Sequence, residues 1–145
     1  MLSLTAALMC VFLTGYVSGL WAEGEVLESL FDGTLPLPPR AAFEPVWSLI
    51  YLLEILALTA AIADGRLRKL LKFWLAAGVM SPLACKAFFG GAKIFSLGLM
   101  TEITVLYLVI TFKFAEKTKV LWLTTLPIAL WHAYLTAINF LTVIP

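Results

Sequence analysis

Charged residues are scarce in this sequence. Lys, Arg, Asp and Glu together make up 13% of the 145 residues, whereas 62% are hydrophobic. The 10 basic and 9 acidic residues nearly cancel and gather in short segments, so no basic face for nucleic acid is indicated. A chain of this size with a mean hydropathy of +1.00 carries too much apolar surface for a water-soluble domain. The composition therefore predicts an integral, multi-pass membrane protein in contact with lipid.

Cysteine and histidine are nearly absent. The cysteines, Cys10 and Cys85, lie in apolar runs far from any Cys-x-x-Cys spacing, so neither a disulfide framework nor a metal site is expected. The single histidine, His132, is interpreted as a side chain hydrogen-bonded to a neighbouring helix, with metal or haem ligation as the alternative. A nucleophile with its base and a phosphate-binding loop are also missing. We therefore do not expect an enzyme.

Long apolar runs dominate the rest of the sequence. At about 1.5 Å per residue, five of them can cross a hydrocarbon core of about 30 Å. Backbone groups in lipid must be hydrogen-bonded within the protein, so each run is predicted to be a helix. The expected fold is a single all-α domain covering 1–145, a bundle of five transmembrane helices. The predicted spans are 2–21, 43–63, 73–91, 96–114 and 120–144.

The links between the spans differ in length and charge. The first, 22–42, is long and acidic, whereas the others are tight and predict that consecutive helices pack side by side. The second and fourth links are basic. By the positive-inside rule, the N-terminus is expected on the cytoplasm-like side and the acidic loop on the outer face. The first span has no positive segment before it, so we expect it to be a span rather than a cleaved signal. The basic residues of the second and fourth links are Arg66, Arg68, Lys69, Lys72, Lys113, Lys117 and Lys119.

The stretch PPRAAFEPVWSLIY, at 38–51, leads into the second span. Its prolines are expected to delay the helix until Phe43 to Pro45. Trp47 and Tyr51 then share one helix face. An interfacial aromatic belt is one interpretation, but Glu54 continues the same face, and a carboxylate at that depth should point into the bundle. We therefore expect this face to be internal.

The stretch LPIALWHAYLTAINF in the fifth span carries a second aromatic stripe. Trp131, Tyr134 and Ile138 are spaced i, i+3 and i+7, and Asn139 follows. Trp131 lies about 20 Å from the end of the run, too deep for a belt residue. The two stripes are therefore predicted to face each other across the bundle, with Asn139 as a polar group beside them.

Three ionisable residues lie within the spans: Glu54, Lys86 and Glu102. We expect Lys86 and Glu102 to pair across the hairpin that turns at Gly90 and Gly91, with Glu54 near enough to share the lysine, because a pair costs less than isolated charges. Such a network can be a structural clamp between helices. The alternatives are the polar end of a ligand cavity or a contact to another subunit.

These motifs resemble the translocator protein, or tryptophan-rich sensory protein, family (TspO/MBR), over nearly the whole chain. The 38–51 stretch is similar to the family's Pro-Pro, Phe, Pro-Val-Trp, Leu-Tyr pattern, and the fifth-span stretch to its Pro, Trp, aromatic, Ala-Thr, Leu-Asn pattern. Phe88-Phe89-Gly90 resembles the Phe-Phe-Gly that ends the family's third helix. The sequence departs from the family in four ways. Ala41 stands for a common tryptophan, Glu54 for an apolar residue, and Lys86 lies in a changed third-helix motif; the family's Trp-Tyr of the first loop is missing. The family's sterol pattern needs a Lys or Arg at the end of the fifth helix, and the residues up to Pro145 supply none.

The resemblance implies a cavity beneath the first loop that binds flat, lipophilic ligands for transport or sensing. Such ligands are tetrapyrroles, for example protoporphyrin or haem, and sterols or other lipids. No cofactor is required. Light-dependent porphyrin breakdown, which the family suggests, would use Trp47 and Trp131, but we do not expect it. The expected ligand-binding residues are Phe43, Trp47, Tyr51, Phe88, Trp131, Tyr134 and Asn139.

A second function remains open from the sequence. The chain can be a non-catalytic accessory subunit of a larger respiratory or photosynthetic membrane complex that keeps the fold without the ligand. The altered third-helix motif and the intramembrane charges favour this alternative, whereas the aromatic positions favour ligand binding. A homodimer, a larger complex, and a mitochondrial, other organellar or bacterial membrane are all compatible with the sequence.

Overall fold

Helices joined by short turns account for most of the residues that the structure describes. The structure is a computed structural model, and it describes residues 2–21, 38–117 and 119–144. The predicted loop residues 22–37, with their acidic side chains, lie outside the described residues. The helices are α1 (Leu2–Trp21), α3 (Arg40–Ala63), the short 3-10 helix η1 (Leu67–Leu70), α4 (Leu71–Phe89), α5 (Lys93–Ala115) and α6 (Lys119–Val143).

The lengths and compositions of these helices are those of transmembrane segments. Within the described residues, four segments are long and apolar enough to cross a membrane, namely Ala41–Ala63, Leu67–Phe89, Lys93–Ala115 and Lys119–Val143. In α1 the described apolar part, Thr5–Gly15, is shorter. The predicted fold class, an all-α membrane bundle of five helices, is confirmed.

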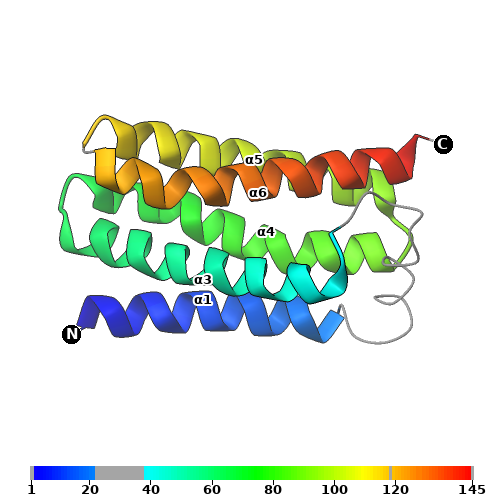
Figure 1. Cartoon of the computed structure of the whole chain (residues 1–145), viewed down its shortest axis with the longest axis horizontal. Helices are drawn as coiled ribbons and strands as arrows, with labels where there is room; N and C mark the ends of the chain where they lie inside the picture. The colour runs from blue at the N-terminus through cyan, green and yellow to red at the C-terminus, as the bar shows by residue number, and fades with distance from the viewer. Residues whose placement is uncertain (1, 22–37, 118, 145) are drawn as a thin grey trace.

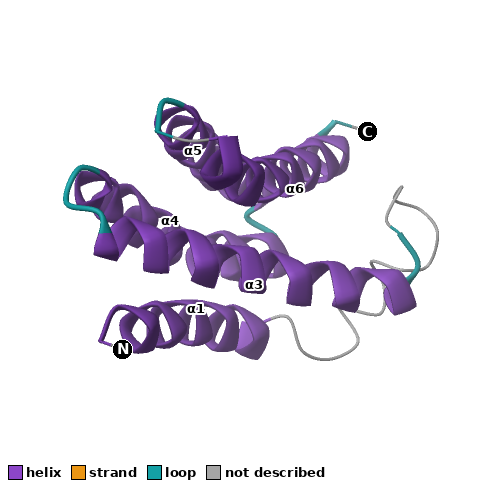
Figure 2. Ribbon diagram, turned by 60° about the vertical axis from the view of Figure 1, so that its left-hand side comes forward, coloured by secondary structure: helices purple, strands orange, loops and turns teal. Residues whose placement is uncertain are grey.

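The five long helices form a ring. Helix α1 packs on α3 and α4, α4 packs on α5, α5 on α6, and α6 returns to α3. Figure 1 shows the helices running along a common axis, with the N- and C-termini at opposite ends of the bundle. Figure 2, turned from that view, shows α5 and α6 as a pair on the far side of α3 and α4 from α1. The inward faces of α3, α5 and α6 therefore meet in the interior, where the buried polar residues lie.

Helix α3 begins earlier than the sequence predicted. Pro39 is its N-cap residue, with φ −49° and ψ 143°, and its carbonyl accepts hydrogen bonds from the backbone N–H groups of Ala42 and Phe43 at 2.7 and 3.0 Å. The first helical residues have no intrahelical partner for their own N–H groups, so a preceding proline does not hinder them. The predicted start at Phe43 to Pro45 was therefore wrong, and Pro45 lies inside the helix.

Small residues let α1 approach its neighbours closely. A Cβ atom built on Gly15 would lie 3.1 Å from the Cζ and Oη atoms of Tyr51 on α3. A Cβ on Gly78 of α4 would lie 3.2 Å from the hydroxyl oxygen of Thr14. Close approach at small residues is the usual basis of helix packing in membranes, where no hydrophobic effect drives helices together. These glycines therefore set the position of α1 against α3 and α4.

The end of the bundle that holds the N-terminus is tied by an ion pair between loops. Lys117 Nζ, after α5, lies 2.6 Å from Asp64 Oδ2, after α3. The hydrogen bond from Lys117, helped by the backbone N–H of Arg66 on Oδ1 at 2.8 Å, lowers the pKa of Asp64. The N-terminus and the loops that carry most of the basic residues lie at this same end (Figure 1).

Candidate functional site

Aromatic side chains from α3 and α6 contact one another in the bundle. Trp47 lies at the centre: its ring centroid is 5.4 Å from that of Tyr51, 5.7 Å from Trp131 and 6.3 Å from Phe43. Trp131 also contacts Phe43 at 5.6 Å and Tyr134 at 5.4 Å. The two stripes predicted from the sequence therefore do face each other. We call the set Phe43, Trp47, Tyr51, Trp131 and Tyr134 the aromatic cluster.

Helical spacing explains how the cluster forms. Phe43, Trp47 and Tyr51 recur every fourth residue, so their rings stand above one another on the face of α3 that α6 packs against. Trp47 and Trp131 meet edge to face, at an interplanar angle of 88°. This arrangement matches the quadrupoles of the two rings, with the positive edge of one on the negative face of the other. The cluster is therefore a specific contact rather than a lipid-facing belt.

One polar atom in the cluster is left without a partner. The indole Nε1 of Trp131 is buried and makes no hydrogen bond within the part of the chain that the structure describes. A buried indole N–H normally finds an acceptor. Trp131 therefore holds a buried donor among the rings of the cluster.

Beneath the cluster lies a buried polar group of three residues from three helices. The Tyr107 hydroxyl on α5 donates a hydrogen bond to Glu54 Oε1 on α3. The Tyr107 ring stacks on the His132 ring of α6, with centroids 4.4 Å apart and planes at 29°. All three side chains are buried, with exposed fractions of 7% for Glu54, 5% for Tyr107 and 4% for His132. Glu54 is thus turned inward, as expected for a carboxylate within a span.

The protonation of His132 follows from its contacts. Its Nδ1 atom lies 2.9 Å from the carbonyl oxygen of Ile128, one turn earlier on α6. A carbonyl only accepts, so Nδ1 must carry the hydrogen, and Nε2 of the neutral ring is then an acceptor. The partner of His132 is therefore its own helix, not the neighbouring helix that we expected. The His132 and Trp47 rings lie edge to face, with centroids 6.3 Å apart. This contact joins the polar group to the aromatic cluster.

The predicted ion pair between Lys86 and Glu102 is not formed. Both side chains are exposed, and the ion pairs that join described residues are Lys113 with Glu116 and Lys117 with Asp64. Glu54, which was expected to share the lysine, is instead bonded to Tyr107.

Helix register explains the missing pair. The Ser96 hydroxyl donates to the carbonyl oxygen of Ala84 at 2.9 Å, so these residues of the antiparallel helices α5 and α4 are level. Lys86 is then level with Ile94, and Glu102 with Gly78. This separates the two charges by eight residues, or about 12 Å along the helix axis. The prediction placed them at one depth, and that was wrong.

Asn139 and Phe88, two of the residues expected to bind the ligand, make other contacts than those of the aromatic cluster. The Asn139 side-chain amide donates a hydrogen bond to Ser96 Oγ at 2.8 Å, and the Ser96 hydroxyl donates one to the carbonyl oxygen of Ala84. These two bonds join α6, α5 and α4. Asn139 Oδ1 is buried and has no hydrogen-bond partner within the described residues. Phe88 contacts Phe89 edge to face at 5.4 Å, at the end of α4. The side-chain amide of Asn139 therefore stabilises the packing of α6 on α5.

Sequence reasoning missed Tyr107 and Ser96. With Ile103, Ile110 and Phe114 they form a buried stripe on α5, spaced as one helix face. That periodicity was visible in the sequence, but aromatic and small residues in an apolar run are usually packing residues, and nothing local marks their hydrogen bonds. His132 was considered and proves to be a buried member of the site. Within the described residues, no group of three or more His, Cys, Asp or Glu side chains could hold a metal ion.

The fold and the site define a multi-pass integral membrane protein with an aromatic contact between its second and fifth long helices. The sequence model of the TspO/MBR family matches residues 4–144, essentially the whole chain. The chain belongs to the TspO/MBR family, which confirms the resemblance seen in its motifs. Comparison with curated proteins gives no match.

Proposed function

We propose that this TspO-like protein binds a flat, lipophilic ligand at the aromatic cluster, for transport or sensing. The ligand class is a tetrapyrrole such as protoporphyrin, with a sterol or other lipid as the alternative. Family membership supports a binding or transport role rather than an enzymatic one. The observation that carries the proposal is the contact between Trp47 and Trp131, whose centroids lie 5.7 Å apart across two helices.

The cluster offers what such a ligand needs. The indole and phenol rings give extended π-faces, on which a conjugated macrocycle gains stacking energy beyond its buried area. The buried Trp131 N–H, which has no acceptor within the described residues, would supply a donor to a ligand oxygen that reaches it, such as a carboxylate of the macrocycle or a sterol hydroxyl. A few polar groups among aromatic side chains are typical of small-molecule sites.

The polar group below the cluster would limit how deep a ligand sits. Glu54, Tyr107 and His132 are in contact with one another and are buried, so a flat apolar ligand gains little by displacing them. The Tyr107 ring covers one face of His132 at 4.4 Å. We therefore place the ligand on the Phe43 side of Trp47 and do not propose that His132 coordinates a haem iron. Light-dependent ligand breakdown is also not part of the proposal.

Tryptophan fluorescence tests the proposal. Protoporphyrin added to the purified protein should quench the emission saturably at micromolar concentrations. Replacing both Trp47 and Trp131 with Phe keeps aromatic rings in place, and it should remove most of the quenching and weaken binding about tenfold, because stacking on each indole contributes about 0.5–1.5 kcal/mol. Trp122→Phe is the matched control: it lies on α6 near its start, outside the aromatic cluster, and should leave the affinity unchanged.

Two outcomes would count against ligand binding. Linear quenching without saturation indicates that the porphyrin only partitions into the detergent or lipid. Equal affinity in the wild type and the Trp47, Trp131 double variant means that the cluster is packing. Either result favours the alternative, an accessory subunit of a larger membrane complex, which native sizing after gentle extraction would show as a high-mass species.

A further inference from the structure

Glu102 is a carboxylate on the outer surface of a membrane-spanning helix. It lies nine residues after Lys93, the first residue of α5, which is about 14 Å along the helix and near the middle of the span. Its side chain is exposed, and within the described residues it makes no ion pair or hydrogen bond. In a bilayer this surface faces lipid or another protein, so the bundle itself leaves the charge unsatisfied.

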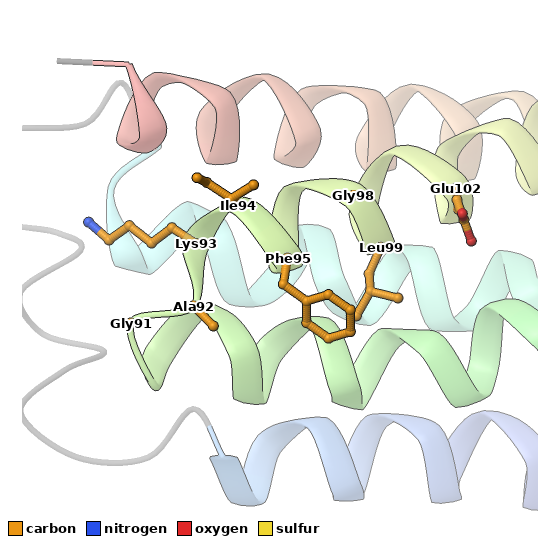
Figure 3. Close-up of a pocket in the computed structure, with 8 residues that line it drawn as sticks. All are labelled: Gly91, Ala92, Lys93, Ile94, Phe95, Gly98, Leu99 and Glu102. Atoms are coloured by element: carbon orange, nitrogen blue, oxygen red, sulfur yellow. The ribbon is translucent and has the colours of Figure 1, made fainter.

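An open groove on α5 ends at this carboxylate. Figure 3 shows Lys93 at one end of the groove and Glu102 at the other, with apolar side chains between them. Ile94 and Phe95 are 77% and 62% exposed, which is far more than a packed helix face allows. The lining residues are Gly91, Ala92, Lys93, Ile94, Phe95, Gly98, Leu99 and Glu102.

Gly98 opens this surface to a neighbouring backbone. A Cβ atom built on Gly98 would meet nothing within 4 Å, so this glycine serves no contact inside the bundle. Gly15 and Gly78, by contrast, are each filled by a side chain of this chain. A small residue on an outward face, one turn from a polar side chain, is the pattern by which helices associate in membranes: the small residue allows approach and the polar residue bonds.

We propose that the α5 surface around Gly98 and Glu102 docks a transmembrane helix of another protein that carries Lys or Arg near its mid-span. The basic side chain would neutralise Glu102, and the helix backbone would approach over Gly98. Ionisable groups within a membrane are tolerated where they pair with an opposite charge. The depth of Glu102, rather than the groove alone, therefore specifies the partner's chemistry.

A second copy of this chain does not fit that requirement. Two copies inserted in the same direction and related by a two-fold axis along the membrane normal meet at equal depths, so Glu102 would face residues of its own level. Lys86 is level with Ile94, and this level is about 12 Å from that of Glu102 along the helix axis. The other basic residues of the described segments lie in the first or last turn of a long helix or in the links between helices. A second copy would therefore bring apolar groups or another carboxylate to Glu102.

A lipid is also a poorer occupant. An anionic headgroup would lie at Lys93, at the surface end of the groove, and its acyl chain would then run past Glu102. Hydrocarbon offers that carboxylate neither a charge nor a donor. The mid-span position thus favours a protein helix, whose side chains can present a cation at a chosen depth.

Co-reconstitution with model helices tests the proposal. The full-length protein, labelled with a donor dye, is placed in phosphatidylcholine vesicles with an acceptor-labelled Leu/Ala transmembrane peptide that has either Lys or Leu at its centre. We expect energy transfer to report at least tenfold tighter association of the Lys peptide. Glu102→Gln should abolish this preference, whereas Glu116→Gln, which removes the same charge from the loop after α5, should keep it. Gly98→Leu should weaken association of the Lys peptide.

Other outcomes overturn the proposal. Equal association of both peptides with the wild type excludes a mid-span cation as the determinant. If Glu102→Gln instead changes the proportion of dimer when the protein is reconstituted alone, the occupant is a second copy. If protoporphyrin binding fails while the peptide preference stands, the proposed ligand function fails and the docking surface survives, because the two measurements report on different faces of the bundle.

Discussion

Tyr107 on α5 donates its hydroxyl hydrogen to the carboxyl group of Glu54 on α3, and this bond joins helices that are not neighbours in the sequence. Both side chains are buried, and the bond gives each of them a hydrogen-bond partner inside the bundle. The ring of Tyr107 also stacks on His132, which brings α6 into the same contact. One buried interaction thus orients three of the five helices around the floor of the candidate site.

Removing the donor should destabilise the bundle. Tyr107→Phe keeps the ring and leaves the buried Glu54 carboxyl without its described partner, so we expect the free energy of unfolding in detergent to fall by about 1–3 kcal/mol. Glu54→Gln keeps an oxygen acceptor and should cost less. The combination of Glu54→Leu with Tyr107→Phe should recover part of the loss, because no polar group then remains unpaired. A Tyr107→Phe variant as stable as the wild type contradicts this role.

The charges of Lys86 and Glu102 should behave independently. Their positions are about 12 Å apart along the helix axis, and mutations that far apart usually add within about 0.3–0.5 kcal/mol. A double-mutant cycle with Lys86→Met and Glu102→Gln, measured by denaturant unfolding in micelles, should therefore give a coupling energy within that margin. A coupling of several kcal/mol would restore the ion pair that the sequence suggested.

Gly15 and Gly98 should differ in how strongly the same substitution affects the stability of the protein. In Gly15→Leu the new Cβ would lie 3.1 Å from the Tyr51 ring, so the ring or α1 must move, at a cost of about 1–3 kcal/mol. Gly98→Leu meets open space and should leave the stability of the isolated protein nearly unchanged. Thermal unfolding of the two variants checks this difference, and equal losses would mean that the packing of α1 on α3 is not as described.

The ion pair between Asp64 and Lys117 should make stability depend on pH in the acidic range. The hydrogen bond from Lys117 lowers the pKa of Asp64 in the folded state. The folded protein therefore holds the ionised carboxylate more strongly than the unfolded chain does. The stabilisation is present above the unfolded pKa of about 3.9 and is lost as the pH falls through the lower, folded value.

Asp64→Asn tests that dependence. The variant should be less stable than the wild type at neutral pH, and the difference should shrink toward pH 3 as Asp64 is protonated in the wild type. High salt should also reduce the difference, because both side chains are partly exposed. Parallel stability curves for the two proteins between pH 3 and pH 7 would show that the pair contributes nothing.

The sequence was sufficient for the fold class and for the facing aromatic stripes. Long apolar runs can satisfy their backbone in lipid only as helices, and the spacing of Trp47 and Tyr51 with Glu54 identified an inward face. The contact of Trp47 with Trp131 follows from those faces. Helix α3 begins before the predicted Phe43 to Pro45 because Pro39 is its N-cap residue, and a helix can begin directly after an N-cap.

The pairings of polar groups could not be predicted in the same way. Which residue of α4 lies level with Glu102 depends on the register of two antiparallel helices, and that register is fixed by Ser96 and Ala84 rather than by hydropathy. Tyr107 meets Glu54 only because the ring of helices brings α5 to α3 across the interior. Depth along one helix can be counted from the sequence, but the relative shift and rotation of two helices are tertiary properties.

Pro45 removes one backbone hydrogen bond from the beginning of α3. Proline has no N–H to offer, so the carbonyl of Ala41, one turn earlier, has no intrahelical donor at that position. The first turn of α3, which carries Phe43, therefore has one backbone hydrogen bond fewer to the rest of the helix than a regular turn has. The position of Phe43 therefore depends also on its ring contacts, with centroids 6.3 Å from that of Trp47 and 5.6 Å from that of Trp131.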